Sequence, residues 1–220
     1  MKLMYAVWGA DDLLSDDLRA ALRATGAERL VVEVDDAAVA DAQLRLSTYA
    51  RPVQAVLSVW TDGDPGAVTD VLRGHVEQLA GWIVDEHVPL PPPGTTDGVR
   101  ADALVNVALL RIPAGMSHET WLERWLGSHT SVAIETQATF GYVQNVVVEP
   151  LLEGQATVDA LVEEHFPPAA VTDLHAFYGS GGDDAELSRR MTRMLESVAT
   201  FGAAENIDVV PTSRYAFDLR

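Results

Sequence analysis

Residues 89–98 read Pro-Leu-Pro-Pro-Pro-Gly-Thr-Thr-Asp-Gly, and this stretch decides how the chain is divided. Proline fixes φ and lacks an amide donor, so the stretch fits neither a helix nor a central strand. It lies near the middle of a chain of 220 residues, a length that suits one large domain or two small ones. We therefore predict a first domain at 1–90, a stiff linker at 91–101 and a second domain at 102–220.

The two halves have the same predicted order of elements. In the first half, Ser15 precedes two acidic residues in the way that an N-cap begins a helix, and Gly26 ends that helix. Apolar residues at helical spacing between Val68 and Ile83 predict a second helix. The predicted strands are 2–9, 29–34, 53–60 and 85–89. The order is β-α-β-β-α-β.

The second half repeats this order beyond the linker. Ser117 caps a predicted helix, Pro167 and Pro168 open a short helical stretch that ends near Tyr178, and a long helix follows with its apolar stripe between Leu187 and Phe201. The predicted strands are 104–112, 142–149, 157–164 and 207–217. This order predicts an antiparallel sheet with both helices on one face.

The strands are apolar on both faces, which predicts that the bare face of each sheet is also buried. In 104–112, Val105, Val107 and Leu109 point to one side of the strand, and Ala108, Leu110 and Ile112 point to the other. A buried second face needs a packing partner, and the sheet of the other half is the economical one. The predicted fold class is α+β: tandem ferredoxin-like (βαββαβ) repeats that form an intrachain pseudo-dimer like a dimeric α/β-barrel. Because this pairing is internal, a monomer and a further homodimer both stay open.

Composition bounds the function. The formal net charge of −18 disfavours binding to nucleic acid or to anionic lipid, since like charges repel. The chain has no cysteine, which removes disulfides and thiolate chemistry. No apolar run is long enough for a membrane span, and the start of the chain does not read as a signal peptide. We expect a soluble, cytoplasmic protein.

Three segments of the second half resemble the EthD-type domain family of the dimeric α/β-barrel group. The first is 110–117, Leu-Arg-Ile-Pro-Ala-Gly-Met-Ser, followed by an aromatic-rich helix that ends near a histidine. The others are 142–147, Tyr-Val-Gln-Asn-Val-Val, and 207–215, Ile-Asp-Val-Val-Pro-Thr-Ser-Arg-Tyr. Together they span about 103–218. The first half lacks the matching tryptophan and histidine, so it is interpreted as a degenerate repeat.

The resemblance implies a ferredoxin-like fold whose sheets pair into a barrel. It implies less about the reaction that the protein catalyses. The wider group includes cofactor-free monooxygenases, polyketide cyclases, decarboxylases and haem enzymes, and fold alone does not choose among them. It does place any site in the second half.

His129 is the candidate catalytic residue. Trp121, Trp125 and His129 are spaced four apart, so they share one helix flank if the helix continues through Gly127. A histidine beside indole rings in an apolar cavity suits proton transfer near neutral pH, and burial would keep it neutral. Trp121 and Trp125 are candidate substrate-binding residues, since they could line a pocket for an aromatic or polyketide-like molecule. The alternatives are a histidine that binds the last carbonyls of its helix, and tryptophans that only pack the core.

Further residues are candidate substrate-binding groups. Tyr142, Gln144 and Asn145 are polar positions on a strand rich in valine, although Asn145 points away from the other two. Arg111 could bind a carboxylate or enolate, and so could Arg214, with surface ion pairing as the alternative for both.

No metal or nucleotide site is predicted. Glu163, Glu164 and His165 are consecutive, so their side chains alternate between faces and make a poor chelate. Residues 179–182, Gly-Ser-Gly-Gly, precede two aspartates that would repel phosphate.

The leading hypothesis is a cofactor-independent enzyme that cyclises, dehydrates or oxidises a hydrophobic aromatic or polyketide-like molecule. Two alternatives remain open, a non-catalytic small-molecule binding or accessory protein and a haem-binding barrel.

Overall fold

Eight antiparallel strands close into one barrel in the computed structural model, which describes residues 1–220. Their order around the barrel is β1-β3-β2-β8-β5-β7-β6-β4. The strands are β1 (Lys2–Ala10), β2 (Ala27–Val34), β3 (Ala55–Thr61), β4 (Val76–Leu90), β5 (Leu104–Leu110), β6 (Gly141–Pro150), β7 (Ala160–Phe166) and β8 (Asp208–Asp218). The predicted α+β class is confirmed.

The strand order repeats between the halves. Within the first half the order is β4-β1-β3-β2, and within the second it is β8-β5-β7-β6, so in each half the first strand lies between the third and the fourth. Two pairings join the halves, β4 with β6 and β2 with β8. The two halves therefore share one continuous sheet and leave no free edge for association with another chain.

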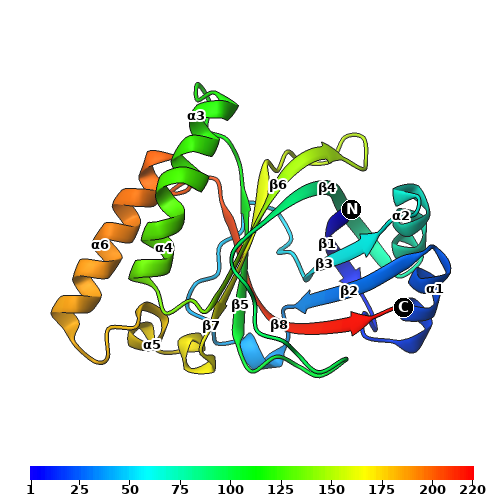
Figure 1. The fold of residues 1–220 in the computed structure, drawn as a ribbon, viewed down its shortest axis with the longest axis horizontal. Coiled ribbons are helices and arrows are strands. Elements are labelled where there is room, and N and C mark those ends of the chain that lie inside the picture. The colour runs from blue at the N-terminus through cyan, green and yellow to red at the C-terminus, as the bar shows by residue number, and fades with distance from the viewer.

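Helices cover the outer face of the barrel on two opposite sides (Figure 1). The first half supplies α1 (Asp16–Ala24), α2 (Pro65–Arg73) and a short 3₁₀ turn η1 (Ala37–Val39). The second half supplies α3 (His118–Leu122), the π-helical η2 (Glu123–His129), α4 (Thr130–Thr136), the 3₁₀ turn η3 (Pro168–Val171), α5 (Leu174–Tyr178) and α6 (Asp184–Thr200). The helix starts predicted at Ser15 and Ser117 are confirmed, because each serine Oγ accepts a backbone N–H of the first turn.

Alternation along each strand separates a core inside the barrel from a core beneath the helices. On β1, Leu3 and Tyr5 pack under α1 and α2, whereas Met4, Ala6 and Trp8 fill the barrel. A third core lies between the strands of the second half and their helices. Both faces of the wall are thus buried, as the two-sided apolar strands predict.

The helix predicted between Val68 and Ile83 is wrong in its second half. Helix α2 ends at Arg73, and β4 begins at Val76 and runs for 15 residues. Gly74 and His75 close the last turn through backbone hydrogen bonds to Val71 and Leu72. The apolar residues beyond it fit helical spacing, but β4 pairs with β1 on one side and β6 on the other. Two rows of sheet hydrogen bonds therefore override the local pattern.

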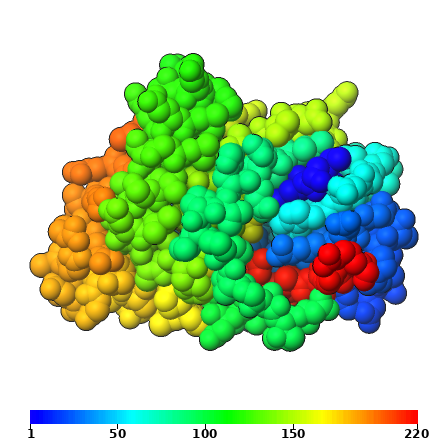
Figure 2. All heavy atoms as spheres, viewed as in Figure 1, coloured from blue at the N-terminus to red at the C-terminus, as the bar shows by residue number.

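The linker at 91–101 crosses one end of the barrel without forming a helix or strand. Pro89 and Leu90, from the stretch predicted to fit neither a helix nor a central strand, form the end of β4, where Leu90 pairs with Tyr142. It is tied to β8, since Gly98 donates to the carbonyl of Ala216 and Ala101 to that of Arg214. In the space-filling view the green mid-chain residues lie beside the red C-terminal residues (Figure 2). The linker connects the halves and also covers part of the barrel mouth.

Candidate active site

An apolar cavity of about 170 Å³ lies outside the barrel wall, between the strands of the second half and their helices. Fifteen of its eighteen lining residues are hydrophobic. The other three are His129, Gln137 and Glu164, and two of the fifteen, Tyr142 and Tyr178, carry a phenol group. An apolar pocket with a few convergent polar groups is the usual form of a small-molecule site.

Two of the aromatic candidates reach this cavity through an irregular helix. The chain continues from α3 through the wider π-helical turn η2 into α4, so Gly127 does not interrupt the helical path. Trp125 and His129 both lie in η2 and both line the cavity. π-Helical turns occur often at functional sites, because they re-aim side chains that a regular helix would place elsewhere.

His129 is buried and held from two sides. Its Nδ1 lies 2.9 Å from Ser197 Oγ on α6, and its ring centre lies 4.7 Å from that of Phe201. Burial lowers the pKa of His129 to about 4, so the imidazole is neutral at pH 7. A neutral imidazole can accept or donate a hydrogen bond at the cavity, but with this pKa it is a weak base.

Glu164 is the ionisable group in the cavity that the sequence analysis set aside. It is 9% exposed, it faces the cavity from β7, and no hydrogen bond holds its carboxyl group. Burial raises its pKa to about 7 from a usual value of 4.5. Near neutral pH it therefore exchanges readily between its acid and base forms, which is the property that general acid–base catalysis needs.

Tyr142 is the cross-strand neighbour of Glu164 on β6. It is 1% exposed, and burial together with the charge of Glu164 holds the pKa of its phenol well above the usual range. The phenol is therefore protonated at pH 7 and can serve as a hydrogen-bond donor. The sequence signal for Glu164 is an acid on the face of β7 where Ala160 and Val162 are apolar, opposite Tyr142. This pattern marks the position, whereas the raised pKa depends on burial in the folded protein.

The cavity mouth is made by residues from both halves. Leu44 and Leu46 of the segment between η1 and β3 line it together with Leu195 of α6, and they are 39%, 44% and 61% exposed. Leu46 forms a backbone bridge with Val209 of β8, which fixes the first-half segment against the second half. The site predicted from the second half alone is thus completed by the first.

Four predicted site residues do not line this cavity. Trp121 packs behind it, with its ring centre 4.9 Å from that of Trp125. Gln144 bonds to Thr130, with 3.1 Å between its Nε2 and the threonine Oγ1. Both are buried in the layer beneath the helices.

Asn145 and Arg111 also lie elsewhere. Asn145 faces the barrel interior, as strand alternation predicts, and its Nδ2 donates to Glu163 at 3.1 Å. Arg111 forms an ion pair with Asp208, with 2.7 Å between Nη2 and Oδ2, and donates two further hydrogen bonds to backbone carbonyls. Ion pairing at the surface was the alternative for Arg111, and the pair that forms is with the buried carboxylate of Asp208.

No protein-family model and no curated protein matches this chain. Several solved structures do match it. A protein described as anthrone oxidase-like has 9% sequence identity and a TM-score of 0.52, with 99% of this chain and 92% of that one covered. A candidate monooxygenase from Fusobacterium nucleatum subsp. nucleatum ATCC 25586 has 7% identity and a TM-score of 0.50, covering 99% of this chain and 94% of that one. The chain shares their fold.

At these identities the likeness concerns the backbone path and assigns no residue a role. No helix here is long and apolar enough to cross a membrane. No group of three or more His, Asp or Glu side chains is arranged to hold a metal ion. The case for chemistry therefore rests on the cavity itself.

Proposed function

We propose that this protein is a cofactor-independent enzyme that transfers a proton to or from a small hydrophobic molecule bound in the helix-side cavity. The observation that carries the proposal is Glu164, an ionisable carboxyl group with a pKa of about 7 facing an apolar cavity. Burying such a group costs free energy, and groups poised near working pH concentrate at active sites.

Glu164 takes the role of general base or acid. As a carboxylate it removes a proton from an activated C–H or O–H of the ligand and becomes a neutral carboxylic acid. The ligand keeps the electron pair as an enolate or phenolate. The Tyr142 phenol donates a hydrogen bond to that oxygen, and neutral His129 offers a second polar contact. Removal of a proton is a first step that cyclisation, dehydration and oxidation at an activated carbon can share.

The size of the cavity narrows the substrate. An apolar cavity of about 150 Å³ is known to hold benzene, and this one has about 170 Å³. A single aromatic or cyclic enone ring is therefore the best fit. A polyketide-like molecule with several rings would enter only if the leucines of the mouth moved.

The properties of the helix-side cavity also bear on the two alternatives, a binding protein and a haem protein. A non-catalytic binding protein needs the apolar walls but not the titratable carboxyl, so Glu164 favours the enzyme. A haem protein needs a cavity large enough for a porphyrin, and pockets for drug-sized ligands already have volumes of about 300–1,000 Å³. The helix-side cavity is smaller than these pockets, and the ring of its only histidine, His129, lies against Ser197. The residues of this cavity therefore do not fit haem.

We also propose that the two halves are tandem ferredoxin-like repeats and that 103–218 is an EthD-type domain. The shared strand order of the halves supports the repeat. The helix that carries Trp125 and His129 supports the EthD-type interpretation.

Proton exchange tests the proposal without knowledge of the full reaction. One-ring phenols, cyclic enones and cyclic diketones would be incubated with the protein in D₂O, and loss of their C–H signals followed by NMR. We expect catalysed exchange for at least one class, reduced roughly a hundredfold or more by Glu164→Gln and unaffected by Glu149→Gln on the exposed end of β6. Binding without exchange in the wild type would assign the cavity to a binding protein. Replacing His129 with Ala measures its separate contribution.

A further inference from the structure

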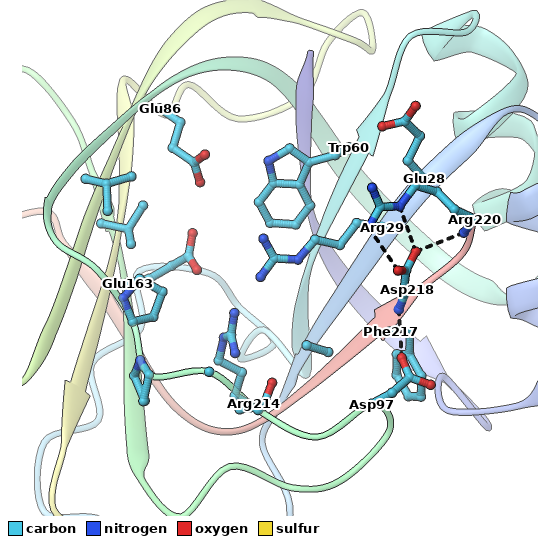
Figure 3. Close-up of a pocket in the computed structure, with 17 residues that line it drawn as sticks. Glu28, Arg29, Trp60, Glu86, Asp97, Glu163, Arg214, Phe217, Asp218 and Arg220 are labelled. Carbon is cyan, nitrogen blue, oxygen red and sulfur yellow. Dashed lines mark hydrogen bonds and ion pairs between the residues drawn. The ribbon is translucent and has the colours of Figure 1, made fainter.

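A second cavity, of about 740 Å³, opens at one end of the barrel interior and is separate from the helix-side cavity. Its wall carries Arg29, Trp60, Glu86, Glu163 and Arg214, which converge from β2, β3, β4, β7 and β8 (Figure 3). Glu163 and Arg214 are buried, whereas Arg29 and Glu86 are exposed toward the opening. Part of its rim is the Pro-rich linker, through Pro92, Pro93 and Gly94. The two cavities lie on opposite sides of the same strands.

Arg214 is buried in this wall without a hydrogen bond. The residue is 2% exposed, and its Nε has no hydrogen-bond partner. Its ion pair with Glu33 is loose, with 3.7 Å between Nε and Oε1. A guanidinium group normally donates hydrogen bonds to several acceptors in its plane. A buried N–H donor that lacks an acceptor lowers the stability of the protein. The empty donor positions of Arg214 thus indicate an acceptor that is not part of the protein.

Arg29 reaches the same space from β2. Its guanidinium lies over the Trp60 ring, 4.4 Å from the ring centre, and forms neither an ion pair nor a hydrogen bond with another residue. Figure 3 shows the side chains of Arg29 and Arg214 pointing into the space beside Glu163. The indole orients Arg29 and leaves the donors at the edge of its guanidinium available.

The acids of the cavity form no hydrogen bond with these two arginines. Lys2 Nζ binds Glu163 at 2.6 Å and Glu86 at 2.8 Å, so one cation serves both carboxylates. Glu33 stands next to Arg214 at 3.7 Å, and burial raises its pKa well above 4.5. The guanidinium donors of Arg29 and Arg214 are therefore left for an acceptor inside the cavity.

The rim has the opposite character. It carries Glu28, Asp97 and Asp218, of which Asp218 is paired with Arg220 at 3.0 Å. A multiply charged anion would be repelled there, whereas a single carboxylate meets less repulsion and can be bound by the two arginines. The volume of the cavity leaves room for the uncharged part of an organic ligand behind its charged group.

We propose that the barrel cavity binds a small organic acid whose single carboxylate accepts hydrogen bonds from both Arg29 and Arg214. This ligand is distinct from the ring-shaped molecule of the helix-side cavity, and its binding does not depend on Glu164.

Calorimetry or ligand-detected NMR with butyrate and its neutral isostere butyramide tests this site. We expect butyrate to bind the wild type at millimolar concentration or below and butyramide not to bind. Arg29→Gln should weaken butyrate roughly tenfold or more, because it removes a charge-assisted hydrogen bond. The matched control is Arg73→Gln, which removes the same charge from an exposed position on α2 and should leave binding unchanged.

Further outcomes separate the two sites. Ala108→Leu, which fills the helix-side cavity, should leave butyrate binding intact. Arg214→Lys keeps the charge but loses the planar donors, so it should also weaken binding; if this variant does not fold, Arg29→Gln decides. The proposal is overturned if folded wild type binds no butyrate, if butyramide binds as well, if inorganic phosphate binds in preference to butyrate, or if Arg29→Gln behaves like Arg73→Gln.

Discussion

Glu163 and Glu164 are neighbours on β7, but their carboxyl groups lie on opposite sides of the barrel wall and have opposite pKa shifts. Glu163 faces the barrel interior. Burial alone would raise its pKa, yet the Lys2 ammonium at 2.6 Å, with Arg214 and His165, lowers it to about 2. Glu164 faces the helix-side cavity without such a partner, and burial raises its pKa to about 7. One step along a strand therefore separates a structural anion from a titratable group.

The first prediction concerns Glu164 and the pH dependence of stability. Its folded pKa is raised, so the folded state holds a proton that the unfolded state loses above about pH 4.5. Wild-type stability should consequently fall relative to Glu164→Gln as pH rises from about 4.5 to about 7 and stay level beyond. The expected change is ~3 kcal/mol across this range, from about 1.4 kcal/mol for each pH step of one.

Urea unfolding of both proteins at several pH values measures this difference. His129 and His165 have lowered pKa values and contribute the opposite slope below about pH 6.5 in both proteins, so they cancel in the comparison. A constant difference between the two proteins would contradict the assignment of a raised pKa to Glu164.

The second prediction concerns Lys2, whose ammonium reaches across the barrel from β1 to β7. Lys2→Met should destabilise the protein by roughly 3–5 kcal/mol at pH 7, because Glu163 then remains buried without its partner. The depressed pKa of Glu163 contributes stability above the unfolded value of about 4.5 that is lost as pH falls toward 2. The penalty of Lys2→Met should therefore shrink below about pH 4.5, as denaturant unfolding at low pH can establish. A Glu163→Gln, Lys2→Met double variant should recover part of the loss.

The third prediction concerns the volume of the helix-side cavity. Ala108 lines it from β5 and is 6% exposed, so Ala108→Leu places additional carbon atoms in the empty space. We expect unchanged or slightly raised stability, by up to ~2 kcal/mol at about 0.8 kcal/mol for each buried methylene, together with loss of one-ring ligand binding. Thermal unfolding and ligand titration measure the two effects. Ala6→Leu inside the barrel is the comparison, since that position is closely packed and the larger side chain should destabilise.

The fourth prediction concerns the segment that forms the cavity mouth. Asp208 is 1% exposed, accepts hydrogen bonds from the amide and hydroxyl of Thr48, and pairs with Arg111. Asp208→Asn keeps the shape but removes the charge, so stability should fall by roughly 1–3 kcal/mol. Amide exchange at Leu46 and Thr48 should speed up.

Hydrogen exchange followed by mass spectrometry would locate the change. Asp35→Asn breaks the ion pair with Arg45 in the same region but at a more exposed position, and it should have a smaller effect. Equal protection of Leu46 in wild type and Asp208→Asn would show that the mouth is held by the bridge to Val209 alone.

Local sequence patterns predicted most helices and strands, because N-caps, glycines and the alternation of apolar residues act over only a few residues. Ser15 and Ser117 begin helices where expected, and the two-sided apolar strands required a buried second face. The exception, β4, shows the limit. Its residues fit a helical pattern, and only hydrogen bonding to β1 and β6 makes them a strand.

The candidate site divides in the same way. Helical spacing alone placed Trp125 and His129 on one flank, and strand alternation alone turned Asn145 away from Tyr142. These local patterns do not predict the raised pKa of Glu164, because it depends on burial beneath helices that lie far from Glu164 in the sequence. The same holds for Glu163, whose partner Lys2 is 161 positions away. The sequence by itself determined element order, strand faces and the apolar character of the site, because these follow from local geometry. The tertiary structure decided which buried charges find partners, because electrostatic free energies depend on distance and burial across the closed barrel.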